Sequence, residues 1–153
     1  ERLVNVSKSC VRVARLFGFD PKVAFLSHST FGKPISKNTR HVRDAIQKLK
    51  KEKVDFDFDG EMQPDVALNP IYQEIYPFSK IVGNANILIM PALHSAAIST
   101  KLMKVFGGGK LIGPLLIGLG LPIEVAPLRA STSEILNLAS IASYSSGIID
   151  YSN

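Results

Sequence analysis

The sequence has a single cysteine, Cys10, and no tryptophan. One cysteine cannot form a disulfide within the chain, and it excludes a metal site built from several cysteines. The three histidines share no metal-ligand spacing with one another or with acidic residues, so we expect no metal site. Cys10 falls among regularly spaced apolar residues, which favours a buried structural thiol over a nucleophile. These features fit a reducing compartment, and we expect a cytoplasmic protein.

Long hydrophobic runs are also missing. The longest, residues 111–123, is interrupted by glycine and proline at positions 113, 114, 118, 120 and 122. A membrane-spanning helix needs about 18 uninterrupted apolar residues, so we expect no membrane span. No basic segment followed by an apolar core resembles a signal peptide. The chain begins at Glu1 rather than Met, and we expect it to be a piece of a longer polypeptide.

The 153 residues are enough for one domain or one lobe of a larger protein, and their net charge of +5 is unevenly distributed. Residues 33–53 contain eight basic and two acidic residues, whereas residues 54–76 contain six acidic and no basic ones. A solvated helix face followed by an acidic strand and loop explains this pattern. A phosphate-rich ligand beside the basic block is the alternative. No aromatic residues interleave with the basic ones, so we expect no nucleic-acid partner.

Helical and strand-like patterns alternate along the chain. Helical periodicity and capping signals predict helices at residues 2–17, 39–52, 68–76, 93–106 and 131–143. Apolar runs predict buried strands at residues 22–26 and 86–90, and alternation predicts a half-exposed or edge strand at residues 54–59. Residues 110–117 and 123–126 resemble paired strands. The sum predicts an α/β fold, with a mainly parallel sheet and helices on both of its faces.

Three of the expected helices carry an apolar stripe that we predict to face the core. In the first helix the stripe consists of Leu3, Val6, Cys10, Val13 and Phe17. In the second it consists of Val42, Ala45, Ile46 and Leu49. In the last it consists of Ile135, Leu138, Ala139 and Ala142, after a capping box at residues 131–134.

Polar residues follow the first two expected strands. The strand at residues 22–26 leads into Ser27, Ser29, Thr30 and Gly32, and the order of strand, hydroxyl-and-glycine loop and helix is typical of anion sites. Ordinary turn residues are the alternative. Residues 59–65 form a second polar cluster, whose acidic side chains are suited to orienting a cation or capping backbone N–H groups, with turn structure as the alternative. The glycines at 107–109 follow a helix and precede an expected strand, the reverse of a dinucleotide-binding loop.

The order of several motifs resembles the phosphate acetyl/butyryltransferase family. The motifs are VAFLSHSTFG at 23–32, DGEMQPD at 59–65, NANILIMP at 84–91, GG at 107–108 and IGPLLIG at 112–118. Within that family, ALNP at 67–70 and YPFSK at 76–80 are most similar to the version fused to the carboxyl side of bacterial NADP-dependent malic enzymes.

The resemblance implies two α/β lobes of the isocitrate/isopropylmalate dehydrogenase-like type, with a cleft that binds CoA and acetyl phosphate. Residues 1–126 correspond to the second lobe, and residues 127–153 to a segment returning toward a first lobe that is largely missing. The same resemblance makes Ser27, Ser29, Thr30 and Gly32 candidate ligand-binding residues. Arg129 is a fifth candidate, because it matches an arginine suited to phosphate groups.

The resemblance also identifies missing chemistry. Active transferases carry Ser-Arg-Gly and, a few residues on, an Asp proposed to deprotonate the CoA thiol. Here Leu128 stands at the Ser position and Ile135 at the Asp position, and neither side chain can transfer a proton. Ala92 and Ala97 likewise stand where transferases carry polar residues. We therefore expect no catalytic residue in this chain.

By resemblance, the chain is the regulatory and oligomerising domain of a malic enzyme, binding acetyl-CoA or a related CoA ester and inactive as a transferase. Its expected partners are the amino-terminal malic-enzyme catalytic region, which uses NADP and Mg²⁺ or Mn²⁺, and further copies of the chain; no cofactor is expected in the chain itself. One alternative is an active phosphate acetyltransferase that uses His28 or His94 as its base. The other is a purely structural dimerisation lobe.

Overall fold

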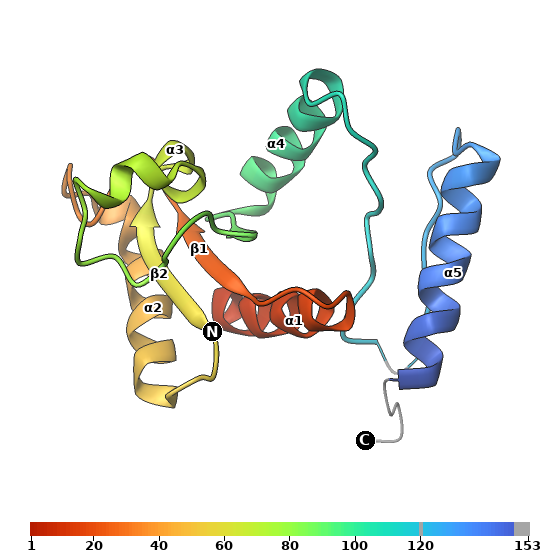
Figure 1. Cartoon of the computed structure of the whole chain (residues 1–153), viewed down its shortest axis with the longest axis horizontal. Helices are drawn as coiled ribbons and strands as arrows, with labels where there is room; N and C mark the ends of the chain where they lie inside the picture. The colour runs from red at the N-terminus through yellow and green to blue at the C-terminus, as the bar shows by residue number, and fades with distance from the viewer. Residues whose placement is uncertain (120, 149–153) are drawn as a thin grey trace. The chain divides into compact units, whose positions relative to one another are not determined.

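A computed structural model describes residues 1–119 and 121–148. The chain forms two compact units, Glu1–Thr100 and Lys101–Asn153. The strands and longer helices are α1 (Arg2–Leu16), β1 (Lys22–Leu26), α2 (Arg40–Glu52), β2 (Asp57–Met62), α3 (Pro64–Leu68), β3 (Ile87–Ile89), α4 (Leu93–Phe106) and α5 (Thr132–Ile148), shown in Figure 1. There are also two short 3₁₀ helices: η1 (Lys37–Thr39) precedes α2, and η2 (Pro70–Gln73) follows α3.

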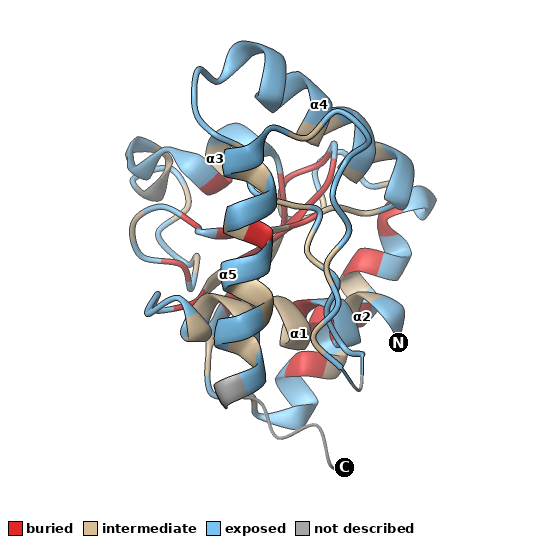
Figure 2. Cartoon of the chain, turned by 90° about the vertical axis from the view of Figure 1, so that its right-hand side faces the viewer, coloured by how far each residue is buried: buried red, intermediate tan, exposed pale blue. Residues whose placement is uncertain are grey.

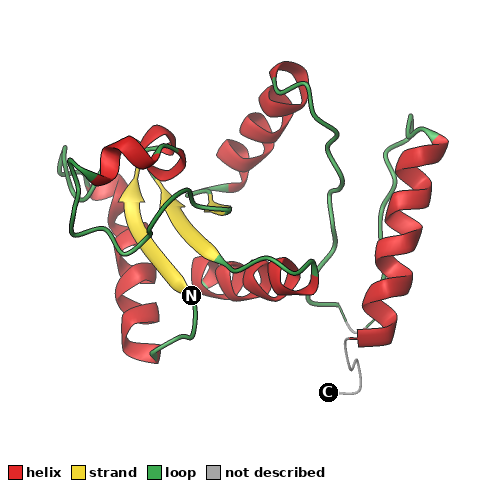
Figure 3. Ribbon diagram, in the orientation of Figure 1, coloured by secondary structure: helices red, strands yellow, loops and turns green. Residues whose placement is uncertain are grey.

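The first unit contains a sheet of three parallel strands in the order β2-β1-β3 (Figure 3). Val23 of the central strand pairs with Phe58 of β2 on one side and with Ile87 of β3 on the other. Parallel neighbours need a crossover, and α2 supplies the one between β1 and β2. The predicted α/β class, with a parallel sheet and helices, is confirmed.

The central strand β1 is buried on both faces, as its continuous apolar run predicted. Val23 and Phe25 pack into a cluster with α1 and α2, and Ala24 and Leu26 pack into a second cluster with Met62 and residues of α3 and the 81–85 segment. Figure 2 shows the buried residues concentrated on the strands and on the inner sides of α1 and α2. The two clusters fix the position of the loop that leaves β1.

The predicted inner stripe is right for α2 and only partly right for α1, where Leu3 and Cys10 pack against the core while partly buried. Val42, Ala45, Ile46 and Leu49 are all buried. In α1 the buried residues are instead Val4, Ser7 and Val11, and Val6 and Phe17 are both 42% exposed. Ser7 can lie in the buried stripe because its hydroxyl donates a 2.8 Å hydrogen bond to the Val4 carbonyl oxygen. A stripe based on apolar residues alone misses such a serine.

The second strand begins later than predicted. β2 covers residues 57–62 rather than 54–59, so it includes Asp59, Gly60 and Glu61. Turn structure was the alternative interpretation of the acidic residues, but the carboxylates of Asp59 and Glu61 are buried and hydrogen-bonded. In place of the helix expected at residues 68–76 the structure has the shorter η2, which Asn69 Oδ1 caps. The helix α3 before it was not predicted. The third strand is residues 87–89 of the expected 86–90.

The second unit contains the end of α4, an irregular segment and α5. The bounds predicted for α4 are confirmed. The capping box predicted at the start of α5 is confirmed as well, since the Ser131 N–H donates to Glu134 Oε2 at 2.7 Å. The paired strands expected at 110–117 and 123–126 are wrong, since no strand follows β3 in the described ranges. Within the first of these segments, Pro114 lacks the N–H that a ladder needs and Gly113 adopts positive φ.

The inner stripe predicted for α5 is only partly right. Leu138 is buried, Ala142 is half-buried, Ala139 is exposed and Ile135 is 50% exposed. Leu138 lies in a small pocket between α5 and the irregular segment, together with Leu111, Ile112, Gly113, Pro127, Glu134 and Asn137. Among the helices of the described residues, none combines the length and apolarity needed to cross a membrane.

Candidate functional site

The loop that follows β1, residues 27–33, is called the hydroxyl loop here because of its two serines and one threonine. It lies beside the carboxyl end of β2: the Ser27 N–H donates to the Met62 carbonyl oxygen at 2.9 Å, and the Phe31 N–H donates to that of Glu61 at 2.6 Å. The side chains of Ser27, Ser29 and Thr30 are buried. The two polar clusters predicted at strand ends therefore meet at one edge of the sheet.

The hydroxyl loop ends in a tight reverse turn. Thr30 and Lys33 exchange two backbone hydrogen bonds of 3.0 Å, and the residues between them have positive φ, +48° at Phe31 and +82° at Gly32. This is the pattern of a type I′ turn, which suits glycine and strains a bulky residue. The Phe31 ring is held by the rings of Tyr76 and Phe78, with centroids 5.4 and 4.8 Å away. Aromatic packing thus offsets the strain of the turn.

Glu61 is a buried carboxylate that occupies a bulge in β2. Phe25 pairs with Gly60 and Leu26 pairs with Met62, which leaves Glu61 as the extra residue. Its side chain is 1% exposed, and Oε1 accepts hydrogen bonds from Ser29 Oγ at 2.8 Å and from the Arg43 guanidinium at 3.0 Å. The other oxygen, Oε2, is buried and has no hydrogen-bond partner in the described part of the chain.

Arg43 carries the contact from β2 to the start of α2. Besides Glu61, its guanidinium donates to Thr39 Oγ1 and, at 2.9 Å, to the carbonyl oxygen of Ser36. Ser36 in turn caps the 3₁₀ turn before α2, accepting from the Asn38 N–H at 3.1 Å. Of the basic residues of α2, Arg43 alone turns inward to the sheet edge, whereas Lys48 pairs with Glu1 and Glu52.

The acidic side chains of the polar cluster at residues 59–65, called the acidic cluster here, both cap backbone N–H groups and orient a cationic side chain. Asp59 caps backbone groups: Oδ1 accepts from the Gly60 N–H at 2.9 Å and Oδ2 from the Lys80 N–H at 2.8 Å. Glu61 orients the cationic Arg43. Sequence reasoning placed these acidic residues at a strand end but did not find the burial of Glu61 or the role of Arg43. The only signal available was the glycine before Glu61, which marks a close backbone approach.

Further hydrogen bonds join the hydroxyl loop to the residue after β2. The Gln63 N–H donates to Thr30 Oγ1 at 3.2 Å, and Gln63 Nε2 donates to the His28 carbonyl oxygen at 2.7 Å. Ser27 Oγ and Ser29 Oγ are 3.2 Å apart, and the Ser29 N–H donates to Ser27 Oγ at 3.3 Å. The loop is therefore a preorganised polar structure on the rigid end of a sheet.

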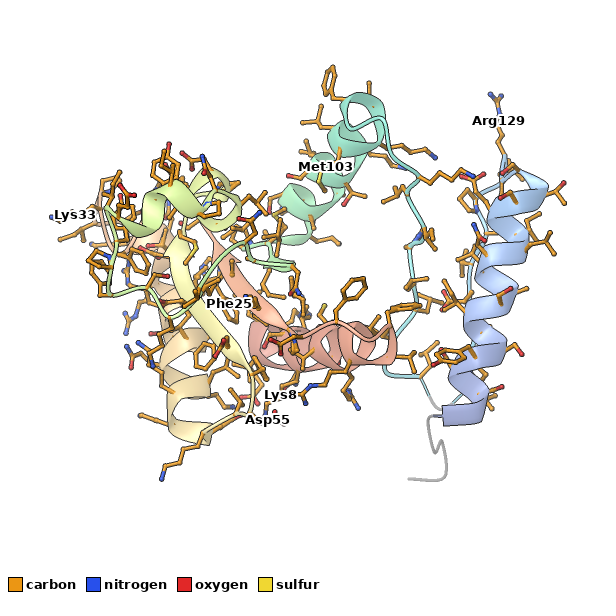
Figure 4. The ribbon with its side chains drawn as sticks, in the orientation of Figure 1. Lys8, Phe25, Lys33, Asp55, Met103 and Arg129 are labelled. Carbon is orange, nitrogen blue, oxygen red and sulfur yellow. The ribbon has the colours of Figure 1, made fainter. Side chains whose placement is uncertain are left out.

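The structure brings four of the five predicted ligand residues together. Ser27, Ser29, Thr30 and Gly32 share the hydroxyl loop in the first unit, whereas Arg129 belongs to the second unit, where it lies near the amino-terminal end of α5 with its side chain extended outward (Figure 4). Leu128, beside it, is fully exposed.

The two candidate bases are also exposed, and they lie on different elements. His28 is in the hydroxyl loop, and His94 is in the first turn of α4. Within the described ranges, the ring of neither histidine has a hydrogen-bond partner, so no neighbouring group fixes its tautomer.

Comparison with known proteins identifies similar chains. The family model described as phosphate acetyl/butaryl transferase matches residues 1–143. An NADP-dependent malic enzyme from Rhizobium meliloti is 45% identical over 147 residues, which cover 96% of this chain and 19% of that protein. A phosphate acetyltransferase from Staphylococcus epidermidis is 36% identical over 91% of this chain and 44% of its own length. The chain thus spans about a fifth of the malic enzymes that it matches.

A solved structure shares the fold. A phosphotransacetylase from Streptococcus pyogenes superposes with a TM-score of 0.86 at 33% identity, over 93% of this chain and 44% of that one. The hydroxyl loop and the acidic cluster both lie within the matched family region, residues 1–143.

Proposed function

The chain belongs to the phosphate acetyl/butaryl transferase family, and we propose that it serves a malic enzyme as a regulatory and oligomerising domain that binds acetyl-CoA. The observation that carries the proposal is the hydroxyl loop, which presents polar groups at the carboxyl edge of a parallel sheet, where ligands bind in open α/β folds. The 45% identity to a malic enzyme supports the choice of parent protein.

In this proposal the domain binds its ligand and does not turn it over. By family resemblance, Leu128 and Ile135 replace a serine and an aspartate of the active transferases, and both are exposed apolar side chains here. Arg129 keeps a guanidinium that is suited to a phosphate of CoA. Ligand binding changes malic-enzyme activity only if acetyl-CoA binds two states of the whole protein with different affinity.

The catalytic region of the proposed parent enzyme would hold NADP and a divalent metal. In the described ranges of this chain, no three His, Cys, Asp or Glu side chains gather closely enough to hold a metal ion. The metal ligands of the parent are therefore assigned, as part of the proposal, to the malic-enzyme region. This domain contributes to that chemistry only through the state that it stabilises.

Calorimetry with acetyl-CoA and malate kinetics of the full-length protein test the proposal. We expect saturable acetyl-CoA binding and an acetyl-CoA-dependent change in kcat or KM for malate. Arg129→Gln is expected to weaken acetyl-CoA binding roughly tenfold, the effect of losing a charged hydrogen bond. Arg12→Gln, an exposed arginine on α1, is the matched control and should change nothing. Absence of binding, together with unchanged malate kinetics, contradicts the proposal.

An active phosphate acetyltransferase is the second candidate, favoured by the 36% identity to such an enzyme. His28, exposed on the hydroxyl loop, or His94, exposed in the first turn of α4, would then serve as the base. Formation of acetyl-CoA from acetyl phosphate and CoA decides this point. Turnover that is well above background and lost in His28→Gln or in His94→Gln supports this candidate, and turnover at background level excludes it.

A structural dimerisation lobe without a ligand is the third candidate. Exposed apolar side chains of the second unit, among them Leu121 and Leu136, favour it. A melting temperature that stays unchanged in CoA, acetyl-CoA and phosphate is expected in that case.

A further inference from the structure

The segment between α3 and β3 carries an exposed apolar surface. Residues 68–82, called the apolar segment here, contain five large apolar side chains that are between 45% and 69% exposed: Leu68, Ile71, Ile75, Phe78 and Val82. The segment belongs to the first unit, whose strands and helices pack around a core of their own. Exposed apolar side chains gathered on a well-packed unit mark an interaction site.

The apolar segment is fixed to the first unit by hydrogen bonds near both of its ends. Before its first residue, the Ala67 carbonyl oxygen accepts from the Ala85 N–H at 2.9 Å. Near its last residue, the Lys80 N–H donates to Asp59 Oδ2 at 2.8 Å. Between these points, further backbone N–H groups donate to carbonyl oxygens of the segment itself. A surface that is ordered in advance loses little conformational entropy when a partner binds.

The apolar segment has apolar side chains on its inner side as well. A small pocket beneath it is lined by residues from the segment, from β2 and from α3, which include Tyr72, Tyr76, Ile81, Met62, Val66 and Ala67. A segment that only closed this pocket would need apolar side chains on its inner side and polar ones toward water. The five exposed side chains are therefore not explained by the packing of the first unit.

The apolar segment also contacts the hydroxyl loop. The Phe78 ring lies against the rings of Phe31 and Tyr76, with centroids 4.8 and 6.1 Å away, and it is nevertheless 64% exposed. A partner that covered Phe78 would therefore lie beside the loop to which the proposed function assigns acetyl-CoA.

Two motifs of the apolar segment indicate its partner. ALNP at 67–70 and YPFSK at 76–80 resemble the version of the family that is fused to malic enzymes, and they supply Leu68 and Phe78 to the exposed surface. The aligned residues make up 19% and 20% of two matched malic enzymes, which leaves about four fifths of each protein outside the alignment. A partner region on the same polypeptide has a high effective concentration, so a small apolar contact is sufficient.

We propose that the apolar segment is the docking surface for the catalytic region of a malic enzyme, with Ile71, Ile75 and Phe78 as its anchors. The inference rests on the proposed function, because it takes the same parent protein. It adds the place on this domain where the two regions meet, which is the edge of the first unit beside the hydroxyl loop.

Photo-cross-linking of the full-length protein tests this surface. Lys80 is exposed within the YPFSK motif, so a linker that attaches to its amine and carries a photoactivatable second end reacts with whatever lies beside the segment. Mass spectrometry identifies the linked peptides, and we expect links from Lys80 to the malic-enzyme region. Lys51, exposed near the end of α2, is the comparison and should give few such links.

A matched pair of variants separates this surface from exposed apolar side chains in general. Ile71 is 63% exposed on the apolar segment, and Ile98 is 60% exposed on α4. Ile71→Asp places a charge in the contact, so the yield of links from Lys80 to the malic-enzyme region should fall roughly tenfold. Ile98→Asp should leave that yield within about twofold. If circular dichroism shows that Ile71→Asp does not fold, Val82→Asp takes its place.

The inference is overturned if Lys80 forms links only within residues 1–153. Links between residues 68–82 of two copies, identified by mixing isotope-labelled and unlabelled protein, would show that a second copy covers the surface instead. It is also overturned if the folded Ile71→Asp and Val82→Asp proteins both keep the wild-type yield of links to the malic-enzyme region.

Failure of the proposed function gives a different result. Acetyl-CoA would then leave malate kinetics unchanged, although Lys80 still forms links to the malic-enzyme region. Regulation by acetyl-CoA without any such links contradicts the inference and leaves the proposed function standing.

Discussion

The two units of the chain differ in how they bury apolar side chains. In the first unit, both faces of β1 are covered, and Val23, Ala24 and Phe25 are fully buried. In the second, Leu138 is the sole buried apolar residue in the described ranges, while Leu121, Leu128 and Leu136 are more than half exposed. The first unit therefore contains its own source of stability, whereas the second has little core of its own.

The comparison assigns different duties to the two units. A site that must hold donors in fixed positions needs rigid support, and the hydroxyl loop starts from the most buried strand of the protein. The second unit is rich in exposed apolar side chains, and such a surface is suited to contact with another protein surface. Changes in the first unit should therefore cost far more than equivalent changes in the second.

The largest difference is expected between two glycine substitutions. In Gly60→Ala the new Cβ would lie 2.6 Å from the Phe25 carbonyl oxygen, at a φ of +143°, so we expect β1 and β2 to separate and soluble protein to be lost. Gly108→Ala also has positive φ, +62°, but meets open space, and should cost about 1 kcal/mol. Soluble yield and circular dichroism compare the two. Equal losses would contradict the contrast between the units.

Removal of a phenylalanine ring should likewise cost more stability in the first unit than in the second. Phe25 is fully buried, so Phe25→Ala is expected to cost about 3–5 kcal/mol through lost burial and a cavity. Phe106, at the end of α4, is 81% exposed, and Phe106→Ala should stay within about 0.5 kcal/mol. Native-state hydrogen exchange of the β1 and α4 peptides measures both opening free energies. A costly Phe106→Ala would reveal a second core.

Variants of the Glu61–Arg43 pair test whether the order of the hydroxyl loop depends on this buried ion pair of the first unit. Arg43→Ala leaves a buried carboxylate without its cation, and we expect a loss of about 2–4 kcal/mol, since the arginine is partly exposed. Arg43→Ala with Glu61→Leu should recover much of that loss but not the order of the hydroxyl loop. Chemical denaturation measures the free energy of unfolding, and amide hydrogen exchange of residues 27–33 measures the order of the hydroxyl loop. If the double variant restores the loop as well, Glu61 has no positioning role.

In the second unit, acid should act on the start of α5. Hydrogen bonds from the Ser131 backbone and side chain, aided by Lys104, hold the pKa of Glu134 below its usual range. A carboxylate with a lowered pKa stabilises the helix end above its unfolded pKa, and that stabilisation is lost as the pH falls through the folded pKa. Exchange at residues 131–135, corrected for intrinsic rate, should rise in acid in the wild type. It should be less pH-dependent in Glu134→Gln.

The smallest effect concerns Cys10. Burial raises the pKa of its thiol, and the side chain packs against the core of the first unit. A disulfide reagent at neutral pH should react far more slowly with the folded protein than with the denatured one, with Cys10→Ser as the blank. Rapid modification of the folded protein would show that α1 opens readily, contrary to the stability assigned to the first unit.

Periodicity predicted the elements whose environment is local and regular. The stripe of α2 and the buried run of β1 were correct because their side chains face a continuous core. The paired strands near residues 110–126 were wrong because the apolar residues were given more weight than the proline at position 114, which the sequence shows, and because the positive φ of Gly113 is visible only in the structure. Glu61 was missed because its burial depends on a bulge opposite Leu26 and on an arginine 18 residues earlier. The role of Arg129 stays a prediction.

The ring contact between Phe31 and Tyr76 makes the hydroxyl loop optically observable. The chain contains no tryptophan to mask tyrosine emission, and the Tyr76 ring centroid lies 5.4 Å from that of the strained turn residue next to Gly32. A rearrangement of the turn that moves the two rings apart changes the surroundings of Tyr76. Because Tyr76 is one of four tyrosines, the difference in ultraviolet fluorescence between the wild type and Tyr76→Phe is the label-free signal that reports on the loop.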